Sequence, residues 1–231
     1  MNLKNKIIDI HTHVSGKNFK NDLIKLKKIS EENNIKKIFI MSTYFPDKKT
    51  GVSNYRLFSH IENEELFSMW CAIDFEFYFW MTYNEIEELL VFNIDKIVGI
   101  KIYSGYQNID FKSKEFRLIL ELARKFNKPI MFHCGYLHKR FKSFNPMDLK
   151  NVFENNLDIT FIIAHLANPF FQETSLLIKD FENVYSDISG LVDTKRGVEE
   201  EIKPYQELFK NLKIDKLLFG TDLPIQTFKQ T

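Results

Sequence analysis

Short apolar runs alternate along the chain with longer amphipathic segments. Runs typical of buried β-strands occupy residues 6–10, 36–42, 66–74, 96–103, 129–134, 159–165, 183–189 and 216–220. Residues 21–34, 83–93 and 113–126 carry apolar side chains at intervals of three and four residues, which predicts helices. In the last of these segments one face collects Phe116, Ile119, Leu120 and Ala123. The pattern therefore predicts strands and helices in regular alternation.

Eight strands that alternate with helices predict a parallel sheet covered by helices, and eight strands close a (β/α)8 TIM barrel. An open doubly wound sheet is the alternative, but no glycine-rich GxGxxG or GxxxxGK loop follows a strand. No linker rich in Pro, Gly or Ser divides residues 1–231, which predicts a single domain. Few residues follow Gly220, so we expect the eighth helix to be short or missing, and self-association into a homo-oligomer to cover the gap.

The composition gives no sign of a polyanionic partner. Lys and Arg number 32 against 31 Asp and Glu, for a formal net charge of +1. Two cysteines make no disulfide framework, and the N-terminal segment is too polar for a signal peptide. No apolar run is long enough to cross a membrane. We therefore expect a cytoplasmic protein that acts on a small molecule, with no nucleic-acid or membrane partner.

Polar residues gather at the carboxyl ends of the predicted strands, where barrel enzymes carry their active sites. His11 and His13 stand two residues apart on the first strand and so share a face. His133 and His165 end the fifth and sixth strands, and Asp222 follows the eighth. Imidazole nitrogen and carboxylate oxygen are ligands that Zn²⁺ and similar ions prefer, so the set predicts a metal site.

Other polar residues are predicted inside the barrel around this set. Asp9, one layer beneath the two histidines of its strand, is expected to orient a ligand as a hydrogen-bond acceptor. Lys101 stands among aliphatic residues, where an unpaired ammonium is costly, so it should be paired with Asp or Glu, deprotonated or modified. Cys134 follows His133 and so points to the opposite, core-facing side of its strand.

Five motifs occur in one order along the chain: "DIHTH", "GIKIY", "PIMFHCG", "FIIAHLA" and "LLFGTDLP". This order resembles the metal-dependent hydrolases of the amidohydrolase superfamily, and most of all the amidohydrolase-related branch that also contains zinc-dependent decarboxylases. PHP-type phosphoesterases fit less well, because they carry a D-x-H pair where this chain has "DLP". TatD-like nucleases fit less well because they carry an acid at the position of Lys101.

The resemblance implies one divalent ion, zinc or else manganese or another divalent metal. Its ligands would be His11, His13, His133 and Asp222. Asp222 would also orient or deprotonate a water, and His165 would assist it or contact the substrate.

Substrate contacts are predicted for Lys101, Tyr136 and His138. In some amidohydrolases a lysine at the fourth strand is carboxylated and bridges two metals; the single-metal branch favours the substrate contact. Asp187 and Ser189 in "YSDISG" are interpreted as hydrogen-bonding residues around the ligands. The loops at 43–54 and 135–145 are expected to cap a pocket.

The predicted activity is hydrolysis of a small amide, ester or lactone through a metal-activated water. Decarboxylation of an aromatic or unsaturated carboxylate is the first alternative, because the same site can act as an electron sink. A barrel that binds metal without turnover is the second.

Overall fold

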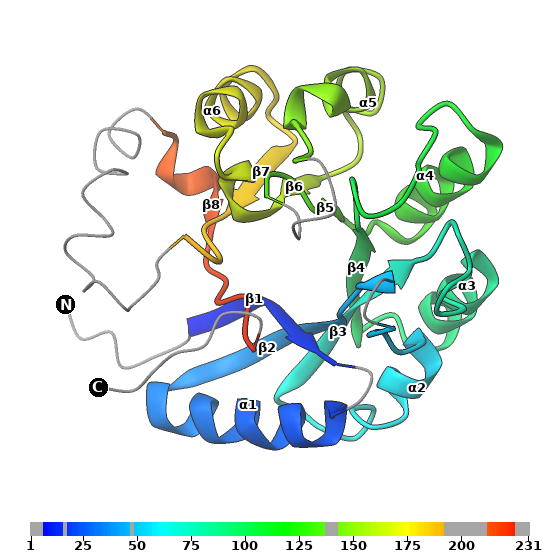
Figure 1. The fold of residues 1–231 in the computed structure, drawn as a ribbon, viewed down its shortest axis with the longest axis vertical. Helices are drawn as coiled ribbons and strands as arrows, with labels where there is room; N and C mark the ends of the chain where they lie inside the picture. Colours follow the sequence, from blue (N-terminus) through cyan, green and yellow to red (C-terminus); the bar gives the residue numbers. More distant parts are fainter. Residues whose placement is uncertain (1–6, 16–17, 47–48, 137–142, 192–211, 225–231) are drawn as a thin grey trace.

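Eight parallel strands form a ring with the helices on its outside (Figure 1). The structure is a computed structural model that describes residues 7–15, 18–46, 49–136, 143–191 and 212–224. The strand order follows the chain from β1 to β8. The strands are β1 (Ile7–Val14), β2 (Ile35–Ser42), β3 (Phe67–Ile73), β4 (Ile97–Ile102), β5 (Ile130–Phe132), β6 (Phe161–Ile163), β7 (Val184–Asp187) and β8 (Leu217–Leu218). All eight predicted strands are present, and β1 runs four residues beyond the apolar run at 6–10, through the two histidines predicted on this strand.

The ring closes between the last strand and the first. The backbone N–H of Ile10 donates to the carbonyl of Phe219 at 3.0 Å, and the N–H of Asp222 donates to the carbonyl of His11 at 2.8 Å. The architecture is therefore the predicted (β/α)8 barrel, and the open doubly wound sheet is excluded.

The three predicted helices form near their predicted bounds. The helices are α1 (Phe19–Asn33), α2 (Asn54–Phe58), α3 (Tyr83–Phe92), α4 (Lys114–Phe126), α5 (Lys150–Glu154) and α6 (Phe171–Asp180), with 3₁₀ turns η2 (Pro146–Leu149), η3 (Ala164–Ala167) and η5 (Ile214–Lys216). Helix α4 begins after Ser113, whose hydroxyl accepts the backbone N–H of Phe116 at 3.1 Å. It ends at Asn127, which is in the left-handed conformation that commonly stops a helix. The predicted apolar face of α4 is buried.

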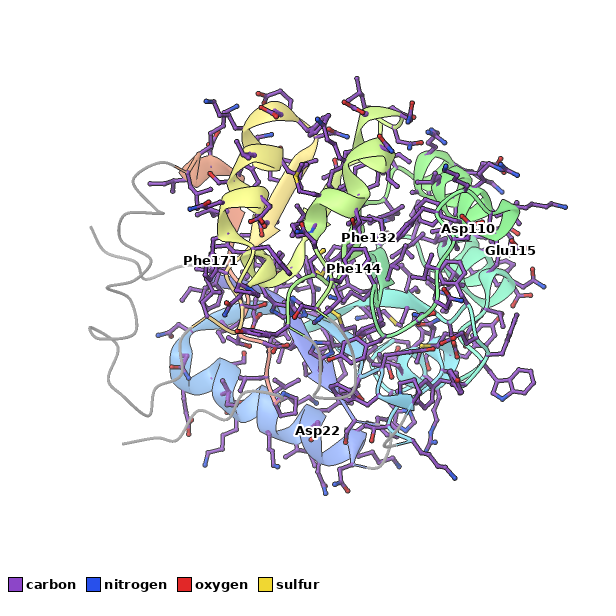
Figure 2. The ribbon with its side chains drawn as sticks, turned by 45° about the horizontal axis from the view of Figure 1, so that its top comes forward. Asp22, Asp110, Glu115, Phe132, Phe144 and Phe171 are labelled. Atoms are coloured by element: carbon purple, nitrogen blue, oxygen red, sulfur yellow. The ribbon has the colours of Figure 1, made fainter. Side chains whose placement is uncertain are left out.

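Apolar side chains pack in two main layers. The larger cluster lies between strands and helices and includes Phe132 of β5, with Phe144 packed against it (Figure 2). A smaller cluster contains Trp70, whose indole N–H donates to the carbonyl of Ile10 at 2.8 Å. Since β2 separates β3 from β1, this bond crosses the barrel interior. A Cβ atom on Gly99 would lie 2.3 Å from the Trp70 ring, so glycine is required where the indole meets β4.

Two further expectations concern the eighth helix and membrane-spanning helices. The predicted short or missing eighth helix falls on residues after β8, of which 225–231 lie outside the described residues. Within the described ranges, no helix combines the length and apolar character needed to cross a bilayer.

Candidate metal centre

Two imidazoles meet on the first strand. His11 and His13 of β1 turn their Nε2 atoms to within 3.1 Å of each other, and both side chains are buried. The chain after β8 approaches β1 closely at this point because Gly220 has no side chain; a Cβ atom there would lie 2.7 Å from Cβ of His11. The structure therefore brings the two histidines together as the sequence predicts.

Asp222 supplies a carboxylate to the same point. Its Oδ1 lies 3.1 Å from Nε2 of His13 and 3.8 Å from Nε2 of His11. This oxygen is buried, and no well-aligned hydrogen-bond donor reaches it from the described part of the chain. A buried acceptor without a donor is costly unless a cation or a water supplies the missing interaction.

A second carboxylate, from β7, orients His11. Asp187 Oδ2 lies 2.8 Å from Nδ1 of His11, while its Oδ1 accepts the backbone N–H groups of His165 and Ser189, each at 3.0 Å, and the hydroxyl of Ser189. Burial opposes ionisation, but the neighbouring His11 and His165 outweigh it and hold the pKa of Asp187 well below its usual range. An ionised carboxylate only accepts, so His11 carries its proton on Nδ1 and keeps a lone pair on Nε2.

The two histidines of β1 are uncharged at neutral pH. Burial, with the charge of Lys101 adding to it, lowers the pKa of His11 to about 3, and burial also lowers the pKa of His13. Burial raises the pKa of Asp222, but His165 and His13 more than compensate, so its pKa lies below the ordinary value. Two neutral imidazoles and one carboxylate are in the protonation states that a divalent ion requires. The donor set therefore fits a zinc-type ion.

His165 and His133 stand beside these three groups. One ring nitrogen of His165 lies with ligand atoms of His11 and Asp222 in a group within 4.8 Å of one another. Its Nδ1 lies 3.1 Å from the carbonyl and 2.9 Å from the hydroxyl oxygen of Ser189, which leaves Nε2 as the acceptor. The rings of His133 and His165 are 5.1 Å apart, and Nε2 of His133 lies 2.9 Å from the carbonyl of Tyr136. His165 therefore belongs to the group of possible ligand atoms, whereas His133 contacts the ring of His165.

The other predicted residues are placed differently. Lys101 is fully buried, and its ammonium makes no hydrogen bond or ion pair with any described residue, so the expected direct pair with Asp or Glu is absent there. Asp9 accepts the backbone N–H of His11 and both donors of Thr221 rather than an imidazole N–H, and burial raises its pKa to about 6. Asp187 therefore has the orienting role expected of Asp9. His138 lies outside the described residues.

A cavity of about 630 Å³ opens beside the centre, within the range of small-molecule pockets. Four residues predicted as metal ligands or catalytic groups line it: His13, His133, His165 and Asp222. Aromatic side chains form much of the remaining wall: Tyr44, Phe45, Tyr103, Tyr106 and Tyr136. Thr43 and Thr50, from the loop after β2, also line the cavity, and so does the described beginning of the loop after β5.

Two residues of the site have no recognisable sequence signal for their contacts. Asp187 was interpreted as a hydrogen-bonding residue, but its partner His11 lies at the other end of the chain. Tyr103 was read as part of the fourth strand, yet its hydroxyl reaches β2 and lies 3.4 Å from Nδ1 of His13. Both contacts depend on the curvature of the barrel rather than on local spacing.

Comparison with known proteins agrees with the architecture. A sequence model of the amidohydrolase family, described as "Amidohydrolase", matches residues 8–231. The chain belongs to the amidohydrolase family. No curated protein sequence gives a significant match to this amidohydrolase.

Solved structures share the fold of this amidohydrolase at low sequence identity. A probable 2-pyrone-4,6-dicarboxylic acid hydrolase from Acinetobacter baumannii has a TM-score of 0.68 and 16% identity, over 95% of this chain and 85% of that one. The 5-carboxyvanillate decarboxylase from Sphingomonas paucimobilis has a TM-score of 0.60 and 11% identity, over 96% and 90%. The 2,6-dihydroxybenzoate decarboxylase from Rhizobium has a TM-score of 0.61 and 11% identity, over 96% and 88%. Likeness at these identities shows the fold alone.

Proposed function

We propose that this amidohydrolase is a metal-dependent hydrolase of a small amide, ester or lactone. One divalent ion, zinc before manganese, would be held by His11, His13, His133 and Asp222. The observation that carries the proposal is the buried Asp222 oxygen, which has no aligned donor and lies within 3.8 Å of the Nε2 atoms of two neutral imidazoles. A divalent ion satisfies these groups together, whereas a single hydrogen atom cannot.

Each polar residue at the cavity wall then has a chemical task. A bound divalent ion would supply a Lewis acid for the substrate carbonyl and lower the pKa of a water to about 7. The carboxylate of Asp222 orients a water at the cavity floor and accepts its proton. His165, whose Nδ1 is fixed by Ser189, presents Nε2 to stabilise negative charge on the carbonyl oxygen or to carry a proton to the leaving group.

The cavity wall supports a substrate with a planar ring. Tyr44 and Tyr103 are stacked at 5.3 Å with an angle of 17° between their rings, and their hydroxyls bond Asp74 and the backbone of Ser42. Their polar ends are therefore occupied, which leaves largely apolar ring surface for a ligand. The three structural neighbours are named for ring-bearing carboxylic acids, which agrees with such a substrate.

Contacts to the polar groups of the substrate are proposed for Tyr136, His138 and Lys101. Tyr136 is exposed at the cavity wall and is available for this role. Lys101 is buried and does not line the described cavity wall, so a direct contact would require a change in its surroundings.

Decarboxylation is a second candidate because the same aromatic wall would hold a benzoate, and two structural neighbours are named decarboxylases. The two reactions differ in their products. Hydrolysis adds the elements of water to the substrate, while decarboxylation releases carbon dioxide.

The test combines metal analysis with a substrate screen. Purified protein should contain about one divalent ion per chain, measured by elemental analysis, and should hydrolyse a member of a panel of lactones, esters and amides. Aromatic carboxylates in the same panel, followed by carbon dioxide release, test the lyase. The proposal would be refuted if the purified protein contained no bound metal and gained no activity on adding Zn²⁺, Mn²⁺ or Co²⁺. Metal binding without turnover of any compound would favour the non-catalytic barrel.

A further inference from the structure

The phenol of Tyr103 links β4 to the first two strands. Tyr103 follows β4 directly and is buried. Its hydroxyl donates to the backbone carbonyl of Ser42, the last residue of β2, and lies 3.4 Å from Nδ1 of His13. Within the described ranges, this hydroxyl is the only hydrogen-bond partner of Nδ1 of His13.

The position of one hydrogen atom follows from these contacts. A carbonyl oxygen can only accept, so the single hydrogen of the phenol points to Ser42. The phenol oxygen can therefore only accept from His13, which places the imidazole proton on Nδ1. Nε2 then carries a lone pair, and it is this atom that lies 3.1 Å from Nε2 of His11 and 3.1 Å from Oδ1 of Asp222.

We propose that Tyr103 is a positioning residue that sets the tautomer of His13 and turns its Nε2 lone pair toward the metal. The role is the counterpart of the one that Asp187 plays for His11, with a neutral oxygen in place of a carboxylate. The inference rests on the metal site of the proposed function, but it is the same for hydrolysis and for decarboxylation.

The surroundings hold the phenol in place. One face of the ring stacks on Tyr44, and the ammonium of Lys101 lies 5.4 Å from the ring centre. Tyr44 is an internal control, because it is also buried and its hydroxyl also donates a hydrogen bond, but to Asp74 rather than beside His13. Removing the hydroxyl of Tyr44 deletes its bond to Asp74, and removing that of Tyr103 deletes its bonds with Ser42 and His13; both changes keep the aromatic rings.

The experiment compares Tyr103→Phe with Tyr44→Phe. Zinc affinity, measured by competition with a chromophoric chelator, should fall roughly 10-fold or more in Tyr103→Phe, the usual scale for losing the partner of a ligating histidine. It should stay within about 2-fold of wild type in Tyr44→Phe. Equal affinities in wild type and a folded Tyr103→Phe would overturn the proposal.

Nitrogen-15 NMR of the histidine rings reports the tautomer of His13, which a loss of stability alone does not change. Metal-free wild type should show His13 with its proton on Nδ1, and Tyr103→Phe should shift population to the Nε2–H form. A wild-type His13 with its proton on Nε2 would overturn the proposal even if the variant does not fold. Wild type that binds no divalent ion would instead refute the proposed function, while the tautomer in the metal-free protein would still test Tyr103.

Discussion

Replacing Asp187 by asparagine tests the orientation of His11 directly. The two oxygens of Asp187 have different partners: Oδ2 faces Nδ1 of His11, and Oδ1 accepts two backbone N–H groups and the hydroxyl of Ser189. Asparagine has one oxygen and one NH₂ group. If its NH₂ replaced Oδ1, it would face three donors, each lost bond costing about 1–3 kcal/mol. The amide oxygen should therefore take the place of Oδ1, and its NH₂ should face His11.

That arrangement reverses the tautomer of His11. An NH₂ group can only donate, so Nδ1 of His11 must become the acceptor and the proton must move to Nε2, which removes the lone pair offered to the metal. Loss of such a partner costs roughly 10- to 100-fold in metal affinity, or about 1.4 to 2.8 kcal/mol. The assay is chelator competition for zinc near neutral pH, where the lowered pKa of Asp187 keeps the wild-type carboxylate ionised.

Asp74→Asn is the matched control. Asp74 is also buried and accepts several donors, from Tyr44, Glu76 and Phe79, but has no hydrogen-bonded histidine among the described residues. Both variants should lose stability in urea unfolding, and only Asp187→Asn should lose metal affinity. A folded Asp187→Asn with wild-type affinity would show either that His11 is not a ligand or that its tautomer does not depend on Asp187.

Four further variants test other parts of the site. His133→Ala should lower zinc content and turnover together, whereas His165→Ala should keep the metal and lose roughly 10²- to 10⁴-fold in rate; equal metal loss in both would make His165 a ligand. In metal-free protein, Lys101→Met should be more stable than wild type, since burial lowers the pKa of Lys101 to about 8 from 10.5 and the folded state loses stability as pH falls between these values. The difference in free energy of unfolding between Lys101→Met and wild type, measured in urea, should grow to about 3 kcal/mol as the pH falls to 8 and then level off. A difference that stays constant between pH 10.5 and pH 8 would contradict burial of the charge as the cause. Gly220→Ala places a Cβ atom 2.7 Å from Cβ of His11 and should cost about 1–3 kcal/mol of stability and weaken zinc binding; unchanged values would mean that β8 can move away.

The fold could be predicted because its signals are local. Each strand is an apolar run bounded by polar residues, and the buried face of α4 repeats at helical spacing, so single segments indicate their own structure. The apolar run of the first strand covers residues 6–10, and His11 and His13 are predicted at the end of this strand. Its continuation to Val14 depends on pairing with β2 and on bonds to the chain after β8, which no local pattern contains.

The site was predictable as a set of residues and not as a network of contacts. Barrel topology brings all strand ends to one rim, so strand-end histidines could be grouped without knowing their distances. The role expected of Asp9 shows the limit. Simple alternation places Asp9 under His11, but the register between β1 and β2 shifts between Asp9 and Thr12, and the carboxylate of Asp9 meets backbone and Thr221 instead. A carboxylate from β7 reaches the imidazole.

Lys101 shows that a buried charge in the barrel does not need the direct ion pair that the sequence predicts. A buried ammonium is expected to have a carboxylate in direct contact, yet no described carboxylate pairs with Lys101. The carboxylates of Asp187 and Asp222 act on it from a greater distance: both raise its pKa, against the larger effect of burial. Both carboxylates are themselves engaged with the histidines of β1. The charge of Lys101 is thus balanced by groups whose geometry serves the candidate metal centre, which explains why the lysine is tolerated without an ion pair. Burial, which outweighs these carboxylates, is what lowers its pKa to about 8.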